Sequence, residues 1–195
     1  MPCAECLAVH LQRLAVQQLG GGEVALGLQQ HAEVVDGGER VRMPIAEGLA
    51  LRLQRLAPSR LTGNREVWLD GGHNAAAGEA LATARVWADK PLHLIVGMIN
   101  SKAPEAFLRP LVPLAASLTG VAVPGEPASL APEEICQAAA GLGLANQPAV
   151  NVEAAIERIS SHADAARILI CGSLYLVGHV LAHFKSGAES SRSGA

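Results

Sequence analysis

The stretch Glu66-Val67-Trp68-Leu69-Asp70-Gly71-Gly72-His73-Asn74 passes abruptly from apolar to polar residues, and the rest of the chain is best interpreted outward from it. Residues 66–69 predict a short strand, and the alanine-rich residues 74–88 predict a helix. The two glycines between them allow a sharp turn and close approach of another molecule to the backbone. The stretch therefore indicates a strand, a ligand-facing loop and a helix.

The alternation of strand and helix continues along residues 65–185. Further strands are predicted at residues 92–96, 117–123, 149–152 and 167–171, and helices at residues 104–116, from 131 onward, 153–163 and 174–184. This order predicts a parallel sheet with helices on both faces. We therefore expect an α/β fold with a Rossmann-like, parallel-rich sheet over residues 65–185.

The residues before this domain are poorly defined by their pattern. Residues 1–43 form an unassigned, partly helical segment. Within it, residues 6–19 have helical spacing, and Asp36-Gly37-Gly38 predicts a turn. No candidate chemistry stands out in this segment.

Two further segments flank the predicted domain. Residues 44–64 are expected to be a linker-like segment, with Pro44 at a possible first helical position. Residues 186–195 are rich in serine and glycine and predict a flexible tail.

Composition excludes several classes of protein. The 195 residues carry a net charge of -3 and only 3% aromatic residues. Neither half has the basic excess that binding to a phosphate backbone needs, and base stacking on aromatic side chains is disfavoured. No apolar run approaches the roughly 20 residues that span a bilayer, and a signal-peptide pattern is absent. We expect a cytoplasmic monomer that binds neither nucleic acid nor membrane.

The four cysteines do not predict a disulfide framework or a metal site. Cys3 and Cys6 form a single C-x-x-C pair without further ligands, whereas zinc needs four; Cys136 and Cys171 lie far away in the sequence. His179 and His183 have metal-like spacing on one predicted helix but no evident third ligand, so a helix-surface position is the preferred interpretation. His93, inside a predicted strand, is interpreted as a hydrogen-bonded core histidine.

Polar residues and glycines follow the predicted strands, where open α/β sheets bind ligands. Asp70 could accept hydrogen bonds from ribose hydroxyls, and Asn74 begins a helix whose free N–H groups suit an anion. The alternative is that both residues simply cap a turn and a helix. Lys102 could neutralise a carboxylate or phosphate, or be a solvated surface lysine. Ser173 could cap the last helix, or its loop could hold a carboxylate.

A set of motifs in a fixed order gives these candidates a context. The chain resembles the folylpolyglutamate/dihydrofolate synthases of the Mur ligase superfamily across about residues 44–185. The matching pieces are Leu51-Arg52-Leu53-Gln54-Arg55-Leu56, Trp68 to Asn74, Gly97-Met98 with Lys102, Phe107-Leu108-Arg109-Pro110-Leu111, Val123-Pro124-Gly125-Glu126 and Cys171-Gly172-Ser173-Leu174-Tyr175-Leu176-Val177-Gly178. The resemblance implies a domain of the Mur ligase C-terminal type.

The resemblance also implies an activity and its reactants. Such ligases use ATP and Mg²⁺ to add L-glutamate to the carboxylate of dihydropteroate or folate. The magnesium ligands and the P-loop belong to another domain of the family. No G-x-x-x-x-G-K-[ST] motif occurs in the 195 residues. The chain is therefore expected to be a fragment that lacks the P-loop ATPase domain and is inactive alone.

Site residues are implied by the resemblance residue by residue. Asp70 resembles the family's nucleotide-contacting aspartate, and Arg52 resembles a linker arginine that reaches ATP. His73 and Ser173 resemble positions near the glutamate site, and Lys102 is grouped with them on the substrate side. No residue is assigned a catalytic role.

Two other interpretations remain for the same residues. A non-catalytic nucleotide-binding or regulatory module would keep the contact made by Asp70 without the ligation. A fragment of a Rossmann oxidoreductase is disfavoured, because no G-x-G-x-x-G follows the first predicted strand.

Overall fold

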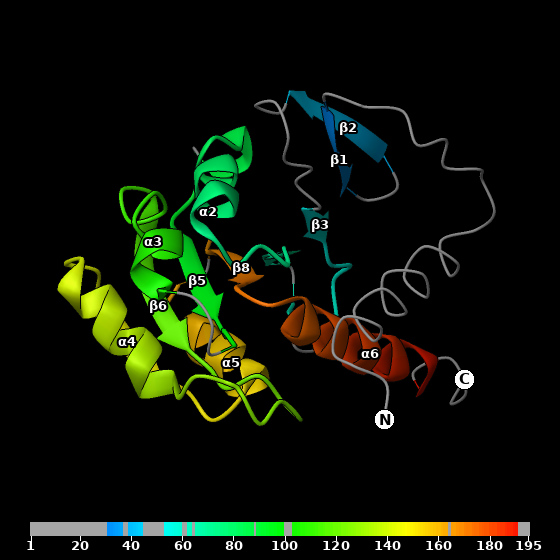
Figure 1. Cartoon of the computed structure of the whole chain (residues 1–195). Helices are drawn as coiled ribbons and strands as arrows, with labels where there is room; N and C mark the ends of the chain where they lie inside the picture. The colour runs from blue at the N-terminus through cyan, green and yellow to red at the C-terminus, as the bar shows by residue number, and fades with distance from the viewer. Residues whose placement is uncertain are drawn as a thin grey trace, which may run out of the picture.

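The computed structural model describes residues 31–36, 39–44, 53–59, 62–63, 65–87, 89–99, 103–163 and 165–190 (Figure 1). The helix predicted at residues 6–19 and the candidate residues Arg52 and Lys102 lie outside these ranges.

One mixed sheet organises the described chain, with strand order β2-β1-β3-β4-β8-β5-β6-β7. The strands are β1 (His31–Asp36), β2 (Glu39–Pro44), β3 (Gln54–Arg55), β4 (Glu66–Leu69), β5 (Leu92–Val96), β6 (Ala115–Gly120), β7 (Asn146–Pro148) and β8 (Arg167–Cys171). The five strands from β4 to β7 in this order are mutually parallel. The predicted α/β fold with a parallel-rich sheet is confirmed.

Helices cover both faces of the parallel strands (Figure 1). They are α2 (Ala75–Ala82), α3 (Pro104–Leu108), α4 (Pro132–Gly141), α5 (Val152–His162) and α6 (Leu174–Ser190), with a 3₁₀ turn η1 (Arg85–Trp87). Buried residues of α2, α3 and α4 share one apolar cluster with Leu94 and Leu169, whereas those of α5 and α6 share another with Ile95 and Ile170. Successive side chains of β5 and β8 thus point to opposite faces of the sheet and contribute to two apolar cores.

Two helices are shorter than predicted. The helix expected over residues 74–88 ends at Ala82, and the chain then turns so that Trp87 Nε1 donates to the Leu81 carbonyl over 2.6 Å. The helix expected over residues 104–116 ends at Leu108. Pro110 and Pro113 explain this early end, since proline has no N–H to donate within a helix.

Three other boundaries shift. β6 begins at Ala115 and ends at Gly120, earlier than predicted. β7 lies at Asn146–Pro148 instead of residues 149–152, because Asn151 caps α5 by accepting from Ala154 N over 2.8 Å. α6 continues to Ser190, so the segment predicted to be a flexible tail begins as helix.

The N-terminal strands extend the sheet beyond the parallel domain. β1 and β2 pair antiparallel, with Asp36 opposite Glu39. Gly37 and Gly38 of the predicted turn lie outside the described residues. Pro44, predicted at a possible first helical position, is the last residue of β2, and residues 45–52 lie outside the described ranges. β3, inside the segment predicted to be linker-like, pairs antiparallel with β4 and parallel with β1. That segment therefore contributes a strand to the sheet.

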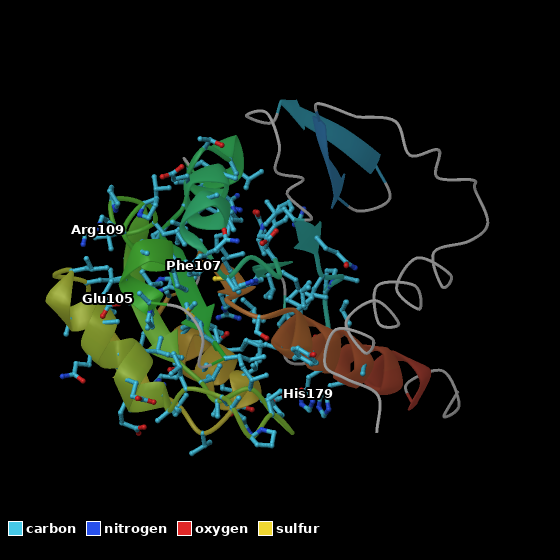
Figure 2. The ribbon with its side chains drawn as sticks, in the orientation of Figure 1. Glu105, Phe107, Arg109 and His179 are labelled. Atoms are coloured by element: carbon cyan, nitrogen blue, oxygen red, sulfur yellow. The ribbon has the colours of Figure 1, made fainter. Side chains whose placement is uncertain are left out.

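Close contact between α2 and α3 depends on the absence of a side chain at Gly78. A Cβ at this position would lie 2.2 Å from the Phe107 carbonyl oxygen. Phe107 itself is fully buried on the inner side of α3, whereas Glu105 and Arg109 lie on its outer side (Figure 2). α2 and α3 can pack this closely only because residue 78 is glycine.

Replacing Gly78 with alanine is expected to destabilise the domain by about 2 kcal/mol, because the backbone of α3 must move away. Gly178→Ala is the matched control, since Gly178 is also helical and has no atom near its Cβ position. That change is expected to stabilise by roughly 0.5 to 1 kcal/mol. Urea unfolding of both variants measures the difference, and equal effects would contradict the packing account.

A cluster of ion pairs lies at the amino ends of β4 and β8. Arg167 on β8 is 5% exposed and forms salt bridges of 2.7 Å with both Glu66 on β4 and Asp89. Lys90 also pairs with Glu66. Burial acts to raise the pKa of Glu66, but the hydrogen bonds from Lys90 and Arg167 outweigh it and leave this pKa below its ordinary value of 4.5.

Acid is expected to weaken the fold through Glu66. Because the folded-state pKa is lowered, the cluster contributes fully above the unfolded-state pKa and loses its contribution as pH falls through the folded value. Glu66→Gln is expected to cost about 2 kcal/mol at neutral pH and to reduce the further loss on acidification below about pH 4.5. Unfolding free energies measured across this range test it, with Glu79→Gln on the exposed face of α2 as control. An unchanged pH profile in Glu66→Gln would count against this role.

Candidate functional site

The carboxyl ends of β4, β8 and β5 meet at one edge of the sheet. Leu69 lies opposite Ile170, and Val96 lies opposite Cys171. The residues that follow these strands, Asp70, Gly172 and Gly97, therefore begin three adjacent loops, as the strand order predicts.

Backbone hydrogen bonds extend the sheet into these loops. Asp70 N donates to Ile170 O over 3.1 Å, and Gly97 N donates to Cys171 O over 3.1 Å. Gly172 N donates to Gly72 O over 3.0 Å. The loops after β4 and β8 thus form one continuous backbone surface.

Asp70 is a buried carboxylate at this edge. The residue is 4% exposed, and Oδ1 accepts from Gly72 N over 2.7 Å. Burial, with a smaller contribution from the Asp70 charge, raises the pKa of the neighbouring Cys171 thiol well above its ordinary value. Cys171 is therefore a neutral apolar neighbour of the Asp70 carboxyl group, which Gly72 N holds in one orientation.

The two glycines after Asp70 are required by packing within the protein. A Cβ on Gly71 would lie 2.1 Å from Leu174 Cδ2 at the start of α6. A Cβ on Gly72 would lie 2.7 Å from Ala77 Cβ and 2.8 Å from Asp70 Oδ1. The sequence suggested that these glycines admit a ligand. The structure shows that the absence of side chains at Gly71 and Gly72 leaves room for α6 and α2.

The polar residues that flank Asp70 have defined local roles. Asn74 Oδ1 caps α2 by accepting from Ala77 N over 2.9 Å. His73 is exposed, with Nδ1 3.3 Å from Gly71 O. Ser173 is buried, and its Oγ accepts from Tyr175 N over 3.2 Å at the start of α6. Asp70, His73 and Ser173 thus lie on loops of two adjacent strands, and Ser173 has the helix-start geometry that the sequence suggested.

A further structured loop at this edge received no role from the sequence. It joins β6 to α4 and contains Gly125, whose φ of +76° favours glycine. Val123 N donates to Ser129 Oγ over 2.8 Å, and Leu130 N donates to Met98 O over 2.8 Å. The loop after β6 is therefore attached to the loop after β5. In the sequence, this loop is marked by Val123-Pro124-Gly125-Glu126, one of the motifs that carry the family resemblance.

The other histidines that the sequence singled out, His93, His179 and His183, are hydrogen-bonded in the fold or lie on its surface. His93 is only partly buried, and its Nδ1 lies 2.8 Å from Ser117 Oγ, so it is hydrogen-bonded as expected but lies outside the core. Burial lowers the pKa of His93. His179 and His183 are exposed on α6, with ring centroids 6.5 Å apart. Among the described residues, no group of three or more His, Cys, Asp or Glu is arranged to hold a metal ion.

In the described part of the chain, no helix combines the length and the apolar character that crossing a bilayer demands.

The position of Gly172 gives a test of how this edge is built. Gly172 has φ +101°, and a Cβ there would lie 2.7 Å from Gly97 O, so Gly172→Ala is expected to destabilise by about 3 kcal/mol or more. Gly143 has φ +78° but open space around it, so Gly143→Ala is expected to cost only about 1 to 2 kcal/mol. Thermal or urea unfolding compares them, and a smaller loss for Gly172→Ala would be inconsistent with the close approach.

Solved structures share this fold. Mycobacterium tuberculosis folylpolyglutamate synthase complexed with ADP matches with a TM-score of 0.57 and 24% identity over 66% of this chain and 32% of that one. E. coli FolC in complex with DHPP and ADP matches with a TM-score of 0.54 and 22% identity, over 67% and 30%. The ligand-free bifunctional folylpolyglutamate synthase/dihydrofolate synthase from Yersinia pestis matches with a TM-score of 0.56 and 22% identity, over 73% and 33%.

These matches cover about a third of each neighbour's length, so the chain corresponds to one part of such proteins. No curated protein sequence matches the chain. The family model described as dihydrofolate synthetase, C-terminal domain, matches residues 54–183, which include β3 to β8 and the site edge. The chain therefore belongs to the dihydrofolate synthetase C-terminal domain family.

Proposed function

We propose that this chain forms the nucleotide-facing C-terminal part of a folylpolyglutamate/dihydrofolate synthase-type ligase. Such a ligase uses ATP and Mg²⁺ to join L-glutamate to a pteroate or folate carboxylate. Family membership supports the proposal, as do the ligands bound in structures of the same fold: ADP in one, and Mn, AMPPNP and L-glutamate in another. The chain alone is proposed to bind nucleotide without completing the ligation.

The observation that carries this proposal is the buried carboxylate of Asp70 at the ligand edge. An ionised carboxylate only accepts hydrogen bonds, so it suits a pair of donor hydroxyls such as those of a ribose. Its orientation is already held by Gly72 N over 2.7 Å, which reduces the ordering needed on binding. Burial strengthens the hydrogen bonds it makes. These properties support a contact between Asp70 and the sugar of a nucleotide.

The remaining candidates are assigned around this contact. Arg52 directly precedes Leu53, which is buried beside the sheet, and its cationic side chain suits the phosphates. His73, Ser173 and Lys102 are assigned to the glutamate side, where donors can neutralise substrate carboxylates. When the carboxyl substrate is activated by phosphorylation and attacked by the amine, such donors stabilise the growing negative charge. The Mg²⁺ ligands are assigned to the P-loop part of the ligase.

A second function remains compatible with the same carboxylate. A nucleotide-binding or regulatory module would use Asp70 in the same way, without any ligation step. The two functions differ in their response to the other reactants. Only the ligase part is expected to bind the amino acid as well as the nucleotide.

Asp70→Asn is expected to weaken ADP binding by about tenfold or more, because the charged acceptor is lost while the side chain keeps its shape and an oxygen for Gly72 N. Isothermal calorimetry with ADP on the purified chain measures the affinity. Asp89→Asn is the matched control, since Asp89 lies at the opposite edge in the Arg167 cluster and its side chain is 67% exposed. Wild-type affinity in Asp70→Asn, or no binding of millimolar ADP to the unmodified chain, would defeat the proposal.

A further inference from the structure

In the described part of the chain, β7 lies at one edge of the sheet. A strand at an edge has one row of backbone N–H and C=O groups that another strand can bind. Ala145 O accepts from Leu118 N over 2.9 Å, so residue 145 faces β6. Because alternate residues of a parallel strand bond to the same neighbour, the backbone groups of residues 144, 146 and 148 face away from the sheet.

Most of these outward-facing groups are already bonded or are missing. The N–H of Leu144 donates to Ala139 O over 3.0 Å, and its carbonyl accepts from Asn146 Nδ2 over 2.8 Å. Pro148 has no N–H, and its carbonyl accepts from Arg158 Nη2 over 3.0 Å. Of these three outward-facing residues, only Asn146 keeps both backbone groups for a further strand.

Three features that discourage the addition of a strand occur together at this edge. β7 has only three residues, it contains a proline, and a charged side chain from α5 covers its last carbonyl. Nε of Arg158 is shielded from solvent, so the guanidinium lies against the protein. Val150, two residues beyond Pro148, is 87% exposed, so an uncovered edge would also offer an apolar contact to an added strand.

We infer that Arg158 and Pro148 together form an edge cap, which keeps β7 from pairing with β7 of a second copy of this chain. A second copy is the partner that the cap excludes, because identical edge strands can pair antiparallel about a twofold axis. The inference goes beyond the proposed function and does not rest on it. β8, β5 and β6 lie between β7 and β4, the strand that leads to Asp70.

Sedimentation equilibrium of the purified chain over a dilution series tests the edge cap. The double variant Pro148→Ala/Arg158→Ala is expected to self-associate at least about tenfold more tightly than the unmodified chain, because one N–H and one carbonyl per copy become available. Arg109→Ala/Pro127→Ala is the matched control, since it changes charge and composition equally at two exposed positions elsewhere. Thermal unfolding checks that each variant is folded. Arg158→Ala alone, which leaves the backbone of β7 unchanged, is expected to give a smaller increase and decides the question if the double variant is unfolded.

Amide hydrogen exchange locates the contact. In the unmodified chain the amide of Asn146 is expected to exchange quickly, whereas that of Ala149, which donates to Gly120 O over 2.9 Å, is expected to be protected. Tighter association of the capless variants with slowed exchange at Asn146 supports the inference. Association no tighter than that of the unmodified chain, equal association of the control, or unchanged exchange at Asn146 would each overturn it.

Discussion

The insertion of β8 between β4 and β5 is the constraint on which the rest of this domain depends. All five residues of β8 are buried, and each neighbour pairs with it in parallel. At its amino end, Arg167 is bound to Glu66 and Asp89. At its other end, the backbone of Ile170 and Cys171 receives Asp70 N and Gly97 N. β8, the last strand in the described part of the chain, therefore positions loops that begin about a hundred and about seventy-five residues earlier in the sequence.

This arrangement explains why glycine recurs at the carboxyl edge. Gly71 leaves room for Leu174, and Gly172 leaves room for the carbonyl of Gly97. The same close packing buries the Asp70 carboxylate next to a neutral thiol. A charge is costly to bury unless hydrogen bonds satisfy it, and the hydrogen bond from Gly72 N to Asp70 Oδ1 contributes to that here. The fold and the proposed site thus depend on the same few backbone contacts.

The sequence predicted the parallel domain well because its strands are short apolar runs separated by glycine or proline. The fold class, β4, β5 and β8 could be predicted from residues 66–69, 92–96 and 167–171 alone. It predicted α3 poorly, because apolar spacing suggested a helix through Pro110 and Pro113, where the missing N–H groups prevent one. β3 could not be predicted, since a two-residue strand leaves no periodicity and exists only through its pairing with β1 and β4. At the site, the pattern indicated Asp70, but the links between the loops of β5 and β6 arise from long-range backbone contacts that no local pattern encodes.

The most direct test of the account is where ADP contacts the chain. Amide chemical shifts recorded during an ADP titration would locate the contact residue by residue. The account predicts the largest changes at Gly71, Gly72 and Gly172, on the loops after β4 and β8, and none at Gly141, the last residue of α4, or at Gly143, which follows it. Changes centred on Gly141 and Gly143, or none anywhere at millimolar ADP, would contradict it.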